Sequence, residues 1–356
     1  MPRASSPLGA LPNAAEVSGA LSRLDAWIAA RGLGTRFGEW LRRVANPARA
    51  LANLESLIGA GEEPGAEELE PLLRVLGASQ TLAATILSVP DSGLRWFRQA
   101  LSLDRVAADE HVRQMLAAAS SGADTAAVRS SEIPAILRRH KRRHFLRIGA
   151  RDLLGLAGVE ETTREISALA DGAIEVASRH ARARVAAEFG EFAADDRLRF
   201  TVLAMGKLGG SELNYSSDVD LVYLYQGGDR SSRGGPRGSL VAHSYAARIS
   251  EHLTRTLGER TAEGVVFRVD LRLRPDGQNG PIVNSLAAAL VYYEAWGQTW
   301  ERAAMLKARP AGGDVELGGS FLEEMRPFVY RRYLDFGVFE SLRDMKAMIA
   351  REVERR

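Results

Sequence analysis

Cysteine is absent from the 356 residues of this chain, which also lacks a long apolar run and a strong net charge. Without cysteine there are no disulfides, no thiolate nucleophile and no cysteine-ligated zinc or iron–sulfur centre. No stretch approaches the ~18 uninterrupted apolar residues of a membrane helix. The formal net charge is only +2, so a basic segment would be a local feature and no nucleic-acid partner is expected.

The first 17 residues, MPRASSPLGALPNAAEV, contain prolines that would interrupt the apolar core of a signal peptide. We therefore expect a cytoplasmic protein with no membrane partner. The apolar share of 46% and the charged share of 26% are close to those of globular proteins and argue against disorder. At about 150 residues per domain, the length predicts two or three domains.

The first half of the sequence has the apolar period of helices. Asn46-Pro47 is typical of a helix start, because asparagine caps the first turn and proline suits its first position. Similar patterns predict helices over about 66–77, 79–89, 107–119 and 160–189.

The pattern changes near residue 198. Short β-type runs predict strands over 200–205, 218–225 and 265–273, with a mobile Gly- and Arg-rich loop over 226–239 between the second and third. A helix is expected over 246–257, and the chain from about 285 is expected to return to helix. The predicted fold class is α+β, with a predominantly helical chain around a small mixed β-sheet.

A dense basic run, residues 138–144, lies within a helical pattern that begins near Glu132. One interpretation is a contact with phosphate or nucleic acid. The other, which we favour because acidic residues elsewhere balance the charge, is a solvated helix face.

The most informative segment runs from Gly206 to Asp220, where a strand enters a Gly-rich turn and returns as a strand that starts with two aspartates. Asp218 and Asp220 are two residues apart on the predicted strand, so both should point to one face. Neighbouring carboxylates repel each other, and a divalent cation removes that repulsion. The glycines would let backbone N–H groups approach a phosphate. DxD pairs also occur by chance, so this segment alone does not establish a site.

The predicted third strand adds a third acid. Apolar residues alternate there with Arg268, Asp270, Arg272 and Arg274, which would share one face. An acid within a row of arginines suits a site that holds both a metal ion and phosphates, whereas alone it would equally suit a surface ion-pair ladder. The two segments together favour a site.

A glycine followed by DxD, with a third acid on a later strand, resembles the DNA polymerase beta nucleotidyltransferase superfamily. The segments GKLGGSELNYSSDVDLVYLY, FRVDLRLRPDGQNGPIVNSLAAALVYYEAWGQTWERAAMLKARPAGGD and YRRYLDFGVFESLRDMKAMI resemble, more closely, the bifunctional glutamine synthetase adenylyltransferase/adenylyl-removing enzyme family. ELNYSSDVD and WERAAMLKARPAGGD are similar to the N-terminal, adenylyl-removing half of that family. The resemblance covers roughly residue 45 to the end.

The resemblance implies a magnesium-dependent nucleotidyltransferase with a polymerase-beta-like sheet. Its reaction would remove AMP from an adenylylated tyrosine of glutamine synthetase by phosphorolysis, which releases ADP. One or two Mg²⁺ ions would be the cofactor, ATP, ADP and inorganic phosphate would be substrates or products, and a PII-type signal-transduction protein would be a regulatory partner. The resemblance implies that the metal ligands and catalytic residues are Asp218, Asp220 and Asp270. The residues that bind phosphate or nucleotide would be Gly206, Lys207, Gly209, Gly210, Ser217, Arg272 and Arg274. Lys307 and Arg309 would make further contacts with the substrate.

The same resemblance divides the chain into a helical region over 1–125, the nucleotidyltransferase domain with flanking helices over 126–315, and the start of a further helical region over 316–356. Because the family continues beyond this point, the chain is expected to be a fragment. Two other functions stay open: adenylylation of glutamine synthetase with ATP, and a non-catalytic helical module that binds a regulatory protein. The second would predict an eroded set of carboxylates, whereas all three are present.

Overall fold

The computed structural model describes residues 14–88, 93–102, 105–120 and 126–330, together with 343, 346–347 and 350–351. The chain divides into two compact units. Unit 1 comprises Met1–Arg105 and His140–Glu165, and unit 2 comprises Val106–Arg139 and Ile166–Arg356. None of the described helices is both long enough and apolar enough to cross a membrane.

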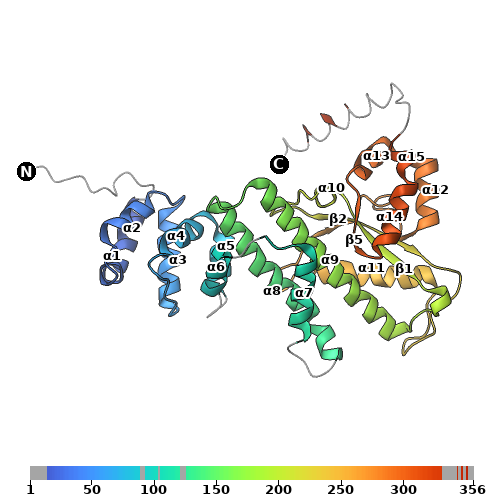
Figure 1. The fold of residues 1–356 in the computed structure, drawn as a ribbon, viewed down its shortest axis with the longest axis horizontal. Coiled ribbons are helices and arrows are strands. Elements are labelled where there is room, and N and C mark those ends of the chain that lie inside the picture. Colours follow the sequence, from blue (N-terminus) through green and yellow to red (C-terminus); the bar gives the residue numbers. More distant parts are fainter. Residues whose placement is uncertain are drawn as a thin grey trace, which may run out of the picture. The chain divides into compact units, whose positions relative to one another are not determined.

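Unit 1 is helical (Figure 1). It contains α1 (Ala14–Ala30), α2 (Gly34–Leu41), α3 (Pro47–Gly59), α4 (Leu69–Ala78), α5 (Gln80–Leu87), α6 (Gly93–Ser102) and the later part of α8 (Ala126–Leu153). The predicted helix start is confirmed, because the Asn46 side chain accepts a hydrogen bond from the Arg49 N–H at 3.0 Å. The core of the unit is built from leucines of α3 and α4 together with Phe37, Phe97 and Leu146.

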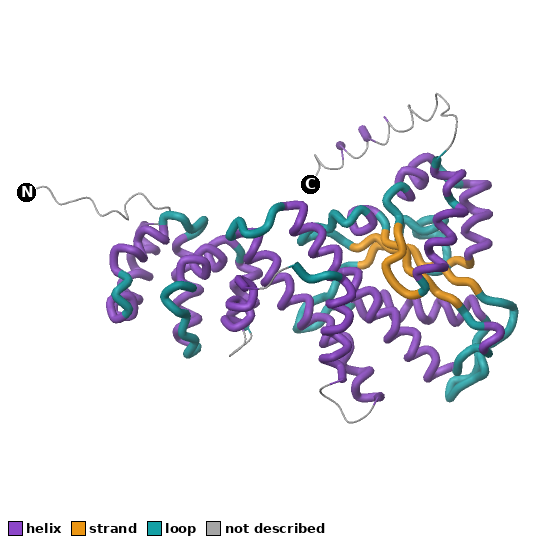
Figure 2. Tube along the Cα trace, viewed as in Figure 1, coloured by secondary structure: helices purple, strands orange, loops and turns teal. Residues whose placement is uncertain are grey.

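Unit 2 contains a small sheet and the helices around it, so the α+β fold class is confirmed (Figure 2). The strands are β1 (Arg199–Ala204), β2 (Val219–Gln226), β3 (Val269–Asp270), β4 (Asn284–Ser285) and β5 (Arg309–Gly313). The helices are α7 (Ala108–Ser120), most of α9 (Val159–Phe189), α10 (Gly206–Gly209), α11 (Ala242–Gly258), α12 (Leu286–Trp296), α13 (Thr299–Met305), α14 (Val315–Glu324) and α15 (Arg326–Val329). A short 3₁₀ helix, Ala194–Asp196, precedes β1.

The sheet is mixed, with the strand order β3-β2-β1-β5. β1 is antiparallel to both β2 and β5, whereas β3 and β4 run parallel to β2 and pair with its opposite ends. β1 and β2 are almost wholly buried because helices cover both faces. On one face Leu203, Val222 and Leu224 pack with residues of α12 and α14. On the other face the Tyr223 hydroxyl lies 3.0 Å from Thr254 Oγ1 of α11.

Two predictions for this unit need correction. The third strand is only two residues long, since the chain after Asp270 turns instead of continuing to Leu273, and alternation therefore does not decide where Arg272 and Arg274 point. The chain after 285 is not wholly helical, because Arg309–Gly313 forms β5 against β1. Its sequence, RPAGG, has no strand character, so its pairing comes from tertiary contact.

The loop predicted over 226–239 is present. It contains an isolated bridge between Gly235 and Gly238, and the Arg233 N–H donates to the Glu191 carbonyl.

Candidate active site at the start of β2

The turn between β1 and β2 is a single helical turn, α10, followed by an extended return. Gly206 has φ +55°, and a Cβ there would overlap the carboxylate of Asp220. The N–H groups of Gly209 and Gly210 donate within the turn, to the carbonyls of Met205 at 2.8 Å and Gly206 at 3.2 Å. Gly206 therefore brings the backbone against the carboxylate, whereas the amides of Gly209 and Gly210 stabilise the turn itself.

Two of the three predicted carboxylates are side by side. Asp220 of β2 and Asp270 of β3 are direct partners in the parallel register, and Asp218 stands just before β2. The pKa of Asp220 is raised to about 6. Burial is the largest cause, followed by the negative charges of Asp270 and then of Asp218. The residues between and after these acids on β2, Val219, Leu221 and Tyr223, are buried in the core, as the alternating pattern predicts.

Arginines neutralise the other two carboxylates. Arg268 Nε lies 2.5 Å from Asp218 Oδ1, and Arg272 Nη2 lies 2.5 Å from Asp270 Oδ2. The Arg272 N–H also donates to Asp270 Oδ1 at 2.9 Å. The side-chain hydrogen bond from Arg272 holds the pKa of Asp270 below its ordinary value. Both guanidinium groups are more than 60% exposed, so either can reach a ligand in solvent.

Lys207 and Ser217 come together at the mouth of the turn. Lys207 Nζ donates to Ser217 Oγ at 3.2 Å, and this hydroxyl donates to Asn214 Oδ1 at 2.7 Å. Lys207 is exposed, and its positive charge lowers the pKa of Asp220 in opposition to the neighbouring acids. A cation and a hydroxyl group thus lie beside the carboxylates, as the sequence predicts.

Three other predicted residues bond to the protein around the site. Arg274 donates to the carbonyls of Leu271 at 2.8 Å and Pro281 at 3.0 Å, which holds the turn after β3. Lys307 Nζ lies 2.6 Å from Glu212 Oε2 and is half exposed.

Arg309 has the most bonds of this group. It donates to the carbonyls of Leu208 at 2.9 Å and Gly209 at 3.2 Å, and to Asp171 Oδ1 of α9 at 3.0 Å. Its guanidinium group therefore connects the Gly-rich turn to α9. Burial raises the pKa of Asp171 to about 6 even though Arg309 opposes the shift.

Asp171 and Arg268 were not among the predicted site residues. Asp171 lies 138 residues from Arg309 in sequence, in the middle of a helix, and no local pattern marks it. Arg268 was visible in the sequence as the first charge in the row that contains Asp270. Its bonds to Asp218 and to the Ser216 carbonyl appear only in the structure.

The donor set fits a divalent cation. Asp220 and Asp270 are paired at one sheet edge, Asp218 stands just before β2, and the repulsion of Asp270 and Asp218 contributes to the raised pKa of Asp220. Carboxylate oxygens with open positions beside them are the usual protein ligands of Mg²⁺. The exposed arginines and Lys207 around the carboxylates are cations that can hold phosphate oxygens. This edge can therefore bind a metal ion and an anionic substrate together.

The basic run at 138–144 is not part of this site. Only Arg139 of its seven residues is exposed, so the predicted solvated face is wrong. Arg138 donates to the Glu259 carbonyl at 3.1 Å, and Arg143 donates to Gln99 Oε1 at 2.9 Å. The stems of long basic side chains pack well against apolar neighbours while their heads find partners, which explains the burial.

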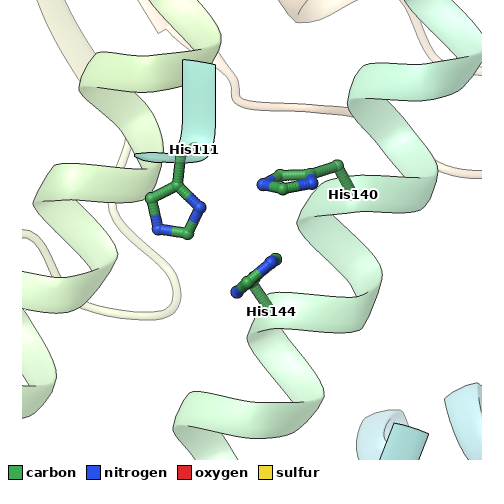
Figure 3. Close-up of side chains that lie close together, drawn as sticks. All are labelled: His111, His140 and His144. Atoms are coloured by element: carbon green, nitrogen blue, oxygen red, sulfur yellow. The ribbon is translucent and has the colours of Figure 1, made fainter. Parts of the chain in front are cut away.

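Figure 3 shows the imidazoles of His140 and His144 one helical turn apart on α8. Their ring centroids are 4.3 Å apart. Burial lowers the pKa of His140 to about 4, and the charges of Arg143 and Arg147 contribute. His140 is therefore neutral at pH 7, and the positive charge of the run comes from its arginines and lysine.

Comparison with known proteins gives a consistent family. The model of the family described as glutamate-ammonia ligase adenylyltransferase matches residues 69–324. The chain is 40% identical over 287 residues to the bifunctional glutamine synthetase adenylyltransferase/adenylyl-removing enzyme of Hahella chejuensis. This match covers 80% of this chain and 29% of the relative. The enzymes of the same name from Nitrosococcus oceani and Pseudomonas aeruginosa are 41% identical over 295 residues and 46% identical over 223 residues. These matches cover 82% and 62% of this chain, and 30% and 22% of the relatives.

The chain thus spans about 30% of the length of the first of these relatives. The match includes the whole Gly206–Asp220 segment and the strand that carries Asp270, which pairs with Asp220. The chain belongs to the glutamate-ammonia ligase adenylyltransferase family.

Proposed function

We propose that this chain is a magnesium-dependent nucleotidyltransferase that removes AMP from an adenylylated tyrosine of glutamine synthetase by phosphorolysis. The observation that carries the proposal is the pairing of Asp220 with Asp270 in register, beside Asp218 and the Gly-rich turn. The names of the relatives support both glutamine synthetase as the partner and AMP as the group transferred. Likeness to the adenylyl-removing half in ELNYSSDVD and WERAAMLKARPAGGD favours removal over addition.

The reaction balances without an oxidant or a water molecule. An oxygen of inorganic phosphate forms a bond to the AMP phosphorus, and the bond from that phosphorus to the tyrosyl oxygen breaks. ADP leaves, and the tyrosyl oxygen takes the proton that the attacking hydrogen phosphate gives up. Because phosphate is already an anion, the step depends on charge neutralisation and alignment more than on a general base.

The residues of the sheet edge would divide this work. Asp218, Asp220 and Asp270 would hold Mg²⁺, which supplies charge stabilisation to the transferred phosphoryl group. Arg268 and Arg272, which pair with Asp218 and Asp270 in the structure, are exposed and free to turn to phosphate oxygens.

Neighbouring residues would complete the site. Lys207 and Ser217 would bind the phosphate groups from the side of the turn, with Gly206 giving them close approach. Asp270 or Asp220 would assist the transfer of the proton to the tyrosyl oxygen. Lys307 would contact the protein substrate, and Arg274 and Arg309 would keep the two turns in place.

The remaining parts of the proposal follow from the family. We infer a polymerase-beta-like nucleotidyltransferase domain over 126–315, a helical region before it and a further helical region from 316. A PII-type signal-transduction protein would regulate the enzyme in the cytoplasm, and ATP would be a substrate only for the opposite reaction. Likeness to the adenylyl-removing half of the family supports this arrangement.

The test is to incubate the chain with adenylylated glutamine synthetase, Mg²⁺ and inorganic phosphate, and to follow nucleotides by chromatography. We expect release of ADP at a rate that rises with phosphate and stops with a chelator. Release of AMP at a rate indifferent to phosphate would replace phosphorolysis with hydrolysis. Consumption of ATP and labelling of unmodified glutamine synthetase would instead assign adenylylation to this chain.

A further inference from the structure

A cavity of about 500 Å³ lies in unit 2, away from the carboxylate site. Its walls are the later part of α9, the segment 191–198 before β1, Arg233 of the loop and the first half of α11. The volume is in the range of small-molecule sites.

The cavity and the carboxylates lie at opposite ends of the same two strands. Leu198, in the cavity wall, immediately precedes Arg199, which is paired with Gln226 at the far end of β2. Ala204 at the other end of β1 pairs with Leu221, next to Asp220. Five residue steps of extended chain between these ends span ~17 Å. A small molecule in the cavity therefore cannot touch the three aspartates.

Three arginines line the cavity: Arg182 of α9, Arg197 before β1, and Arg233. Throughout the described part of the chain, none of the three forms an ion pair or a side-chain hydrogen bond, whereas most arginines of this unit have a carboxylate or carbonyl partner. Among the described residues that line the cavity, Glu191 is the one acid, so they carry an excess of positive charge. Like charges gathered at one concave surface repel, and an anion bound among them would relieve that repulsion.

The rest of the wall is apolar and aromatic. Phe192 and Tyr245 pack edge to face, with ring centroids 5.1 Å apart at 79°, and Leu198 and Ile249 are buried behind them. The Tyr245 side chain is only 5% exposed, and its hydroxyl has no hydrogen-bond partner among the described residues. A hydroxyl donor and an apolar wall, in a cavity that three arginines also line, suit a ligand that has both a carbon body and acidic groups.

We propose that this cavity binds a small organic anion with two negative charges, a dicarboxylate or a phosphate monoester. Guanidinium groups bind the planar faces of carboxylates and phosphates in the same fork geometry, so the two classes share this recognition. The acidic groups contact Arg182, Arg197 and Arg233, and the carbon body packs on Phe192 and Tyr245.

The probes are succinate, inorganic phosphate and the uncharged succinamide, titrated into the full chain by isothermal calorimetry. Arg197→Gln and Arg233→Gln remove charge at exposed positions, so the fold should tolerate both. Arg260→Gln, an exposed arginine beyond the other end of α11, is the matched control. We expect saturable binding of succinate, none of succinamide, and about a tenfold loss of succinate affinity in each cavity variant but not in the control.

The phosphate arm separates the two classes of ligand. Competition of phosphate with succinate extends the site to phosphate monoesters, and lack of competition restricts it to dicarboxylates. Phosphate that binds at the carboxylate site instead would be unaffected by Arg197→Gln and Arg233→Gln. The proposal is overturned if neither succinate nor phosphate binds, or if both cavity variants bind them as the wild type does.

Discussion

Two groups of basic residues in this chain look alike in sequence and differ in their surroundings. On α8, Arg147 is 3% exposed and lies 2.5 Å from the fully buried Glu165. Beside β2, Arg268 and Arg272 are more than 60% exposed and pair with carboxylates at the mouth of the site. The first group joins helices of unit 1, whereas the second can exchange its partner for a ligand. The burial of the acid partner, and not the number of arginines nearby, distinguishes arginines that stabilise the fold from arginines that can bind a ligand.

The buried pair should have the largest effect on stability. Arg147→Met removes the guanidinium group that pairs with the buried Glu165 carboxylate, and we expect a loss of about 3–5 kcal/mol in the free energy of unfolding. Chemical denaturation measures this directly. The double variant Arg147→Met with Glu165→Leu should recover most of the loss, because an apolar pair needs no neutralising charge. A double variant as unstable as the single one would mean that other contacts of Arg147 carry the stability.

The opposite outcome is expected for the three partly buried carboxylates. Asp220→Asn removes a proposed metal ligand and one of three repelling charges, so turnover should fall by about a thousandfold while the melting temperature stays equal or rises. The readouts are ADP release from adenylylated glutamine synthetase and thermal unfolding. Asp229→Asn, an exposed acid on the loop after β2, is the control and should keep full activity. If Asp220→Asn is stable and active, the carboxylates do not take part in the reaction as proposed.

Asp171 offers an intermediate case, since it is largely buried but belongs to the support of the site. Burial raises its pKa in the folded chain to about 6 from an ordinary 3.8, so the fold binds the proton more tightly than the unfolded chain does. Its contribution to stability is therefore fully present below pH ~4 and is lost as the pH rises through 6. The advantage of the wild type over Asp171→Asn should fall between pH 4 and 7, by up to about 3 kcal/mol.

Asp314 provides the control of opposite sign for this scan. The hydrogen bond from Arg199 lowers the pKa of Asp314, so its contribution is present above pH ~4 and is lost at lower pH. The advantage of the wild type over Asp314→Asn should stay constant between pH 4 and 7. A flat profile for Asp171→Asn would show that Arg309 keeps the Asp171 carboxylate charged at every pH tested.

The difference between the two regions also explains what the sequence could predict. Helix starts such as Asn46-Pro47 and the apolar runs that form β1 and β2 are local patterns, and both were predicted correctly. β5, the two-residue β3 and the bond from Arg309 to Asp171 depend on partners far along the chain. The burial of the run at 138–144 was missed for the same reason, since its partners Gln99 and Glu259 lie outside the local pattern. The three aspartates stood out in the sequence because the chemistry proposed for them needs one residue type at fixed strand positions.

The glycines of the turn test how tightly the site is packed. A Cβ on Gly209 would overlap the Lys307 carbonyl, so Gly209→Ala must displace backbone and should cost about 1–3 kcal/mol of stability. A Cβ on Gly210 would lie 3.1 Å from the flexible Lys307 side chain, and Gly210→Ala is the matched control with little expected loss. Denaturant midpoints of the two variants measure the contrast. Equal midpoints would mean that the turn moves away from β5 without cost.

The smallest expected effect distinguishes two arginines that the sequence placed in the same row. Arg272 is exposed and, among the described residues, its side chain bonds to Asp270 alone, so Arg272→Ala should leave the melting temperature nearly unchanged and raise the KM for phosphate about tenfold. Arg274 donates to several carbonyls of the following turn, so Arg274→Ala should lower the melting temperature first and change phosphate use only as the turn loosens. Melting temperature and phosphate dependence, measured on the same two variants, separate a ligand contact from a structural one. If Arg272→Ala lowers the melting temperature and keeps the KM for phosphate, its bond to Asp270 is structural, and the phosphate must be held by Lys207, Ser217 and Arg268.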